Sequence, residues 1–86
     1  MKSIINKKNF LIKLLEKKKN IPKEIKKDID SFRYLDHGQI DSLELISFVI
    51  SIEKKFSIKF TPKDLSSKEF RTVIGLVKLI EKKIKL

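Results

Sequence analysis

The 86-residue sequence contains no cysteine, which excludes a disulfide framework, a thiolate nucleophile and a zinc site built from cysteine. Glycine and proline number only two each, too few for the many tight turns of a β-sandwich or barrel. Lysine, glutamate, leucine and isoleucine are plentiful instead. This composition predicts an all-α fold, a small up-down helical bundle.

Long hydrophobic runs are also absent. The most apolar segment, residues 43–52, contains Glu44 and two serines, and it is much shorter than the ~20 apolar residues of a membrane-spanning helix. Residues 1–8 lack the continuous apolar core of a secretion signal. Apolar residues make up 41% of the chain, enough to bury one core. We therefore expect a single domain over residues 1–86 that is cytoplasmic, monomeric and not inserted in a membrane.

The net charge of +10 is distributed unevenly along the chain. Ten lysines and four acids give residues 1–30 a net charge of +6, and residues 54–86 carry +7. Residues 31–53 hold Arg33 against four acids, a net charge of −3. Two explanations of the basic flanks stay open: they serve an anionic partner, or they reflect a coding bias that fills solvated helix faces with lysine.

Amphipathic periodicity predicts three main helices, one short helix and a long loop between the first two main helices. The expected main helices cover residues 3–18, 42–55 and 72–83, and the short one covers 64–67, with Leu65 pointing inward. The long connection over residues 23–41 has room for a short helical piece near its start. A connection of this length is more often functional than idle.

The start of the second main helix carries the clearest local signal. Asp41 stands at the N-cap and Glu44 follows three residues later, the spacing of a capping box. One apolar stripe is expected to face the core, namely Leu45, Val49, Ile52 and Phe56. A second stripe lies on nearly the opposite side and consists of Leu43, Ile46 and Ile50. A small bundle cannot easily bury both sides, so the second stripe is a candidate docking surface unless the long connection folds over it.

Ser42, in the first turn of this helix, has no surroundings suited to hydrolysis. No Gly-x-Ser-x-Gly elbow is present, and the only candidate base is His37, which is more simply an ordinary loop residue. The sequence also lacks the ligand spacing of a metal site and a glycine-rich phosphate loop. We therefore expect no catalytic residues and no metal site.

The residues around Ser42 resemble the attachment motif of acyl carrier proteins. Asp41-Ser42-Leu43 follows Gly38 and precedes Glu44, as in that family. The similarity covers roughly residues 29–84 and includes further positions: Phe32, Leu35, Glu53, Lys55-Phe56, Ile58 and Thr72-Val73. Several features in the right order are much more specific than the tripeptide alone.

The resemblance implies a non-catalytic carrier that is itself the substrate of a phosphopantetheinyl transferase. In that family the serine hydroxyl, here Ser42 flanked by Asp41 and Leu43, receives 4'-phosphopantetheine from coenzyme A. The arm then holds an acyl or aminoacyl group as a thioester for fatty acid, polyketide, peptide or cell-envelope pathways. Partners would include a loading ligase or synthase and an acceptor transferase. The residues expected to contact partners are Leu43, Glu44, Ile46, Ile50 and Glu53.

The chain departs from the family pattern in two respects. Typical carriers are acidic, whereas this chain is basic and has Ser47 and Lys54 where acids are common in the family. This difference predicts a specialised carrier with its own set of enzymes. Gly38 lies four residues before Ser42, which resembles D-alanyl carriers and some peptidyl carriers. Aminoacyl and fatty acyl cargoes both stay open.

A small basic helical protein that binds nucleic acid is the alternative from another class. The net charge and the lysine-rich first and last helices favour it. Against it, Arg33 and Arg71 are the only arginines, the phenylalanines mostly occupy core-like positions, and no recognition-helix pattern is present. A membrane-surface binder is a third interpretation, but the first helix has no tryptophan and needs its apolar face for the core.

Overall fold

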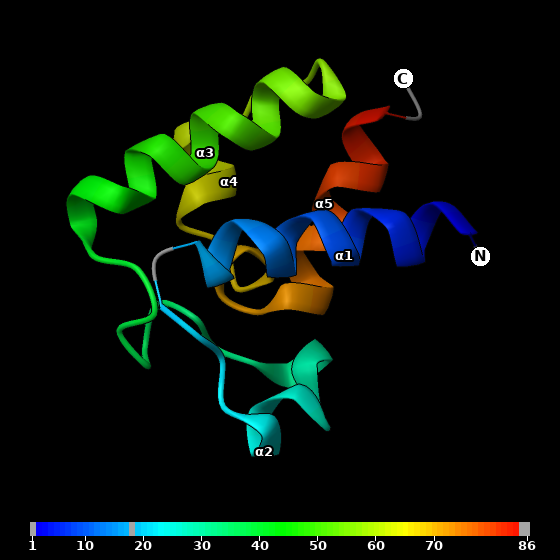
Figure 1. Cartoon of the computed structure of the whole chain (residues 1–86). Helices are drawn as coiled ribbons and strands as arrows, with labels where there is room; N and C mark the ends of the chain where they lie inside the picture. The colour runs from blue at the N-terminus through cyan, green and yellow to red at the C-terminus, as the bar shows by residue number, and fades with distance from the viewer. Residues whose placement is uncertain (1, 18, 85–86) are drawn as a thin grey trace.

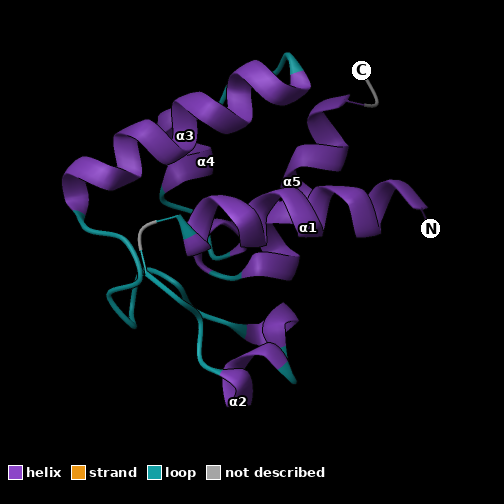
Figure 2. Ribbon diagram, in the orientation of Figure 1, coloured by secondary structure: helices purple, strands orange, loops and turns teal. Residues whose placement is uncertain are grey.

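Three long helices form the framework of the fold (Figure 1). In the computed structural model, which describes residues 2–17 and 19–84, they are α1 (Lys2–Glu16), α3 (Ser42–Phe56) and α5 (Val73–Ile84). The connections contain α2 (Lys23–Lys26), α4 (Pro62–Leu65) and the 3₁₀ turns Ile29–Ser31 and Glu69–Arg71. None of the described residues lies in a strand (Figure 2), and the predicted all-α fold is confirmed. Lys18, the expected end of the first helix, lies outside the described residues.

The core forms where α1 packs against α5, with α3 closing one side (Figure 1). Its fully buried aliphatic side chains come from all three long helices: Leu11, Leu15, Ile52, Val73, Leu76, Val77 and Ile80. The 3₁₀ turn before α5 approaches that helix closely at Gly75. A Cβ on Gly75 would lie 2.4 Å from the carbonyl oxygen of Glu69, so only glycine permits this contact.

The expected core-facing stripe of α3 packs against the core, but it omits one buried residue, Phe48. Phe48 and Ile52 are its buried residues, whereas Leu45, Val49 and Phe56 are only partly buried. The ring of Phe48 packs against that of Tyr34, with ring centroids 5.4 Å apart. The long connection, which contributes Tyr34, therefore forms part of the surface on which α3 packs.

The short helix α4 begins two residues earlier than predicted. Pro62 occupies its first position, and Thr61 and Asp64 form a reciprocal capping box. Both signals are present in the sequence, since proline suits the first helical position and Thr-x-x-Asp suits a cap. The expectation that Leu65 points inward is wrong, because its side chain is 42% exposed on the α3 side of α4.

Tyr34 ties the long connection to the segment that precedes α5. Its side chain is fully buried, and its hydroxyl donates a hydrogen bond to the carbonyl oxygen of Phe70. Burial raises the pKa of Tyr34 far above the usual value for tyrosine. The neutral hydroxyl is therefore the form that the folded chain retains.

None of the helices in the described part of the chain is long and apolar enough to cross a bilayer.

Replacement of Tyr34 by phenylalanine tests the buried hydrogen bond. Tyr34→Phe leaves the Phe70 carbonyl without its donor, which should cost about 1–3 kcal/mol of unfolding free energy at neutral pH. Burial in the folded state raises the pKa of Tyr34. The Tyr34 hydroxyl therefore makes its full contribution to the unfolding free energy below the unfolded-state pKa of about 10, and this contribution declines at higher pH. Urea unfolding at several pH values should show the difference between wild type and variant shrinking above pH ~10. A difference that stays constant through that range would contradict this account.

Candidate functional site

The start of α3 is fixed by a capping box, as the sequence predicts. The Asp41 carboxylate accepts a hydrogen bond from the Glu44 N–H at 2.8 Å, and Glu44 Oε1 accepts one from the Asp41 N–H at 2.9 Å. Ser42 is the first helical residue and is exposed. Within the described chain its hydroxyl has no hydrogen-bond partner. The capping work is done by its neighbours, which leaves the Ser42 hydroxyl available.

The segment before Ser42 makes a tight turn and then returns to the core. Gly38 has a φ of 72°, a conformation that glycine adopts without strain. Its carbonyl oxygen accepts a hydrogen bond from Lys19 Nζ at 3.1 Å. Gln39 and Ile40, which follow, are each only 4% exposed. The chain is thus anchored immediately before the exposed pair Asp41-Ser42.

Gln39 holds this segment against the end of α1. Its side-chain amide donates a hydrogen bond to the carbonyl oxygen of Leu15 at 3.0 Å and another to that of Lys19. The last carbonyl groups of a helix receive no hydrogen bond from within the helix. Gln39 therefore supplies the donor that the Leu15 carbonyl oxygen lacks within α1. A role for Gln39 is not predictable from the sequence, because a lone glutamine in a connection carries no periodic or capping signal. Its partners become visible only in the tertiary structure.

The predicted second stripe of α3 is exposed, and the long connection does not cover it. Leu43 is 80% exposed, Ile46 60% and Ile50 45%. Leu65 of α4 extends this surface, and a wholly apolar hollow of about 230 Å³ lies between the two helices. We call the exposed surface made by these residues the apolar patch: Leu43, Ile46, Ile50 and Leu65. Solvent-exposed apolar side chains that gather in this way typically mark a contact site for another molecule.

The two candidate partner-facing acids have contacts within the chain. Glu44 belongs to the capping box, and Glu53 Oε2 accepts a hydrogen bond from the Phe60 N–H at 2.8 Å. Glu53 therefore orders the loop that leaves α3. Contact of either residue with a partner stays a prediction.

The remaining polar residues near the site do not form a catalytic arrangement. His37 is exposed, with its ring 5.4 Å from that of Phe32. Asp36 is paired with both Arg33 and Arg71, each at 3.5 Å. Among the residues that the structure describes, no group of histidines and carboxylates could hold a metal ion. What this region offers is an exposed hydroxyl on a firmly held helix start.

Comparison with known families gives one match. The sequence model of the family described as "Phosphopantetheine attachment site" matches residues 10–80, which include Ser42 and all of α3. Searches of curated proteins and of solved structures gave no match.

Removal of the Gln39 amide tests the anchor. Gln39→Leu keeps a side chain of similar size but leaves the Leu15 and Lys19 carbonyls without this donor, so unfolding free energy should fall by about 1–3 kcal/mol. Backbone amides of residues 40–44 should also exchange with deuterium faster. Asn20→Ala, an exposed change in the connection after α1, should alter stability by less than ~0.5 kcal/mol. Equal stability of the two variants would show that the anchor contributes nothing.

Proposed function

The chain belongs to the phosphopantetheine attachment family, and we propose that Ser42 is the residue that carries its 4'-phosphopantetheine arm. Domains of this family bind that prosthetic group, so the chain is a phosphopantetheine carrier domain. The observation that carries the assignment to Ser42 is its hydroxyl, which is exposed, unpartnered in the described chain and located directly after an acidic N-cap.

The start of α3 fits a phosphodiester on this hydroxyl. In the attachment step Ser42 Oγ loses its proton and bonds to the phosphorus of coenzyme A's phosphopantetheine, as the bond to the adenosine bisphosphate portion breaks. The Ser42 and Leu43 N–H groups, which precede the first intrahelical donor, would hold the phosphate together with the positive end of the helix dipole. Asp41 adds negative charge here. Asp41 fixes the helix start, and the family resemblance implies that it serves the modifying enzyme rather than the phosphate.

With the arm attached, the chain would act as a carrier of acyl or aminoacyl groups and would not itself catalyse a reaction. When bound, the arm supplies a thiol, which the cysteine-free chain lacks, and the thiol holds an acyl or aminoacyl group as a thioester. The chain itself presents Ser42 on the rigid start of a helix. A phosphopantetheinyl transferase would modify it, a ligase or synthase would load it, and an acceptor transferase would unload it.

The apolar patch is the proposed docking surface for these enzymes. Around α3, Ile46 lies only about 40° from Ser42, so an enzyme that reaches the hydroxyl also meets the patch. Leu43 and Ile46 are the most exposed large apolar side chains on this helix, and burying them would stabilise a complex. Glu53, which lines a hollow together with Ile50, and Glu44, near the start of the helix, are the candidate polar contacts.

Mass spectrometry after enzymatic modification tests the attachment residue. Incubation with coenzyme A and a broad-specificity phosphopantetheinyl transferase should add one phosphopantetheine group to the wild-type protein. Ser42→Ala should abolish the gain, whereas Ser47→Ala, a matched change at an exposed serine of the same helix, should retain it. An unchanged mass for folded wild-type protein would refute the proposal.

A kinetic comparison tests the apolar patch. Ile46→Ser should raise the transferase's KM for the carrier about fivefold, corresponding to ~1 kcal/mol of lost apolar contact. Its effect on stability should stay below ~0.5 kcal/mol, because the side chain is mostly exposed in the free protein. Lys78→Ser, at an exposed position of α5, is the control and should leave KM unchanged. A KM for Ile46→Ser equal to that of wild type would exclude the patch from transferase docking.

A further inference from the structure

The side of α3 that faces α1 forms a groove with a cationic rim, and we propose that it binds an acidic, leucine-bearing segment of a partner protein. This surface is separate from the apolar patch. Ser51 lies nine residues after Ser42, which places it about 180° around the helix. A partner seated in the groove would therefore leave Ser42 accessible, and binding there does not depend on modification of Ser42.

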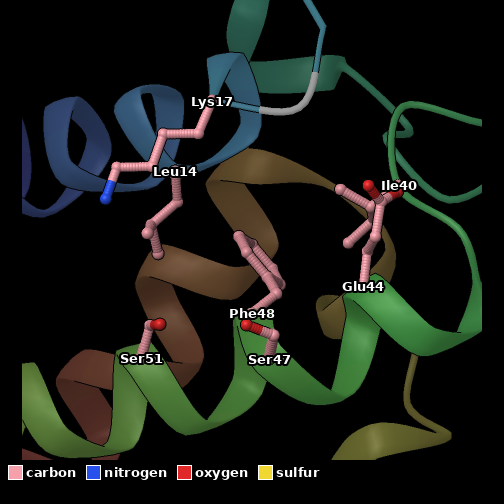
Figure 3. Close-up of a pocket in the computed structure, with 7 residues that line it drawn as sticks. All are labelled: Leu14, Lys17, Ile40, Glu44, Ser47, Phe48 and Ser51. Atoms are coloured by element: carbon pink, nitrogen blue, oxygen red, sulfur yellow. The ribbon is translucent and has the colours of Figure 1, made fainter.

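Two hollows make up the groove. The first, about 230 Å³, is lined by residues of both helices and by the segment before α3. Figure 3 shows Ser47 and Ser51 on α3 opposite Leu14 on α1, with Phe48 between them and Glu44 at one end. The second hollow, about 420 Å³, lies farther along the same helices and includes Phe10 and Phe56. We call the two hollows together the α1–α3 groove.

The charged groups that line the groove are almost all lysines. Lys13 lies on α1, Lys17 follows directly after the end of that helix, and Lys55 lies on α3. None of the three has a carboxylate partner among the described residues. The only acid that lines the groove is Glu44, whose Oε1 already accepts the Asp41 N–H. In Figure 3 the Lys17 side chain extends away from Glu44, so the rim keeps its positive charge.

Four lysines outside the groove are neutralised within the fold. Lys7, Lys8, Lys26 and Lys83 each form an ion pair with an acid on another segment. Lys55 contacts the groove's own floor, with Nζ 5.5 Å from the centre of the Phe10 ring. A cation above an aromatic ring keeps its charge and can still meet a carboxylate. The groove therefore joins unneutralised charge to apolar surface in one place.

The combination fits a protein segment better than a nucleic acid. Leu14 and Phe48 provide an apolar floor, and Ser47, Ser51, Asn6 and Asn9 provide hydrogen-bonding groups. Glutamates with interspersed leucines would match both features. A nucleic acid would use arginines and free aromatic faces, but Arg33 and Arg71 both pair with Asp36. The ring of Phe10 is packed edge-on against that of Phe56, with centroids 5.5 Å apart.

Titration of isotope-labelled protein with a synthetic peptide tests the proposal. The probe is a helical peptide in which glutamates surround a stripe of leucines, followed by NMR chemical shifts. Shifts should change at Leu14, Lys17, Ser47 and Ser51 and remain unchanged at Leu43 and Ile46. A peptide with lysine in place of every glutamate should not bind. Perturbation confined to the apolar patch would overturn the proposal.

Two triple variants with the same net charge distinguish the effect of the groove lysines on peptide binding from the effect of the chain's overall positive charge. The triple variant Lys13→Gln, Lys17→Gln, Lys55→Gln should weaken peptide binding about tenfold. The control triple Lys27→Gln, Lys68→Gln, Lys78→Gln changes exposed lysines without ion pairs and has the same net charge. It should change affinity less than threefold or so. Equal losses in the two triples would mean that the lysines act only through total charge, and the proposal would be wrong.

Two further arms exclude other anions and folding defects. A single-stranded oligonucleotide of equal charge, or an anionic phospholipid vesicle, that binds the same residues more tightly than the peptide would overturn the choice of partner. Ser47→Asp places a negative charge in the groove at an exposed position and should also weaken binding of the acidic peptide.

The circular dichroism spectrum of each variant should match that of wild type, since every substituted side chain in these variants is exposed.

Discussion

The two reciprocal hydrogen bonds between Asp41 and Glu44 are the constraint on which the site depends. They fix the residue at which α3 begins, and helix geometry then fixes the directions of its side chains relative to one another. With the start at Ser42, Phe48 and Ile52 point inward and Leu43 and Ile46 point outward. The same bonds use the side chains on either side of Ser42, so its hydroxyl is left without a partner in the described chain.

The rest of the structure holds this helix start in place. Gln39 joins the preceding segment to the end of α1, and Tyr34 joins the long connection to Phe70 before α5. The connection is long, but buried polar groups anchor its second half. Since loops carry function when a rigid scaffold positions them, these two buried hydrogen bonds explain how a connection with little regular structure can present one serine reproducibly.

The sequence predicted the features that depend on local spacing. The three long helices, the capping box and the exposed stripe with Leu43 all follow from periodicity or from the Asp-x-x-Glu spacing. The predicted core-facing stripe of α3 does pack against the core, but it omits the buried Phe48, whose ring packs against Tyr34 from another segment. The Gln39 anchor and the α1–α3 groove depend likewise on contacts between distant parts of the chain. The start of α4 was an avoidable error, since Thr61 and Pro62 are recognisable capping signals.

The most direct test of the central claim is to locate the attached group among the three serines of α3. The protein should be modified with coenzyme A and a phosphopantetheinyl transferase, digested, and fragmented by tandem mass spectrometry. The account predicts that fragments containing Ser42 carry the phosphopantetheine and that fragments containing only Ser47 or Ser51 do not. Phosphopantetheine on Ser47 or Ser51, with Ser42 unmodified, would contradict it.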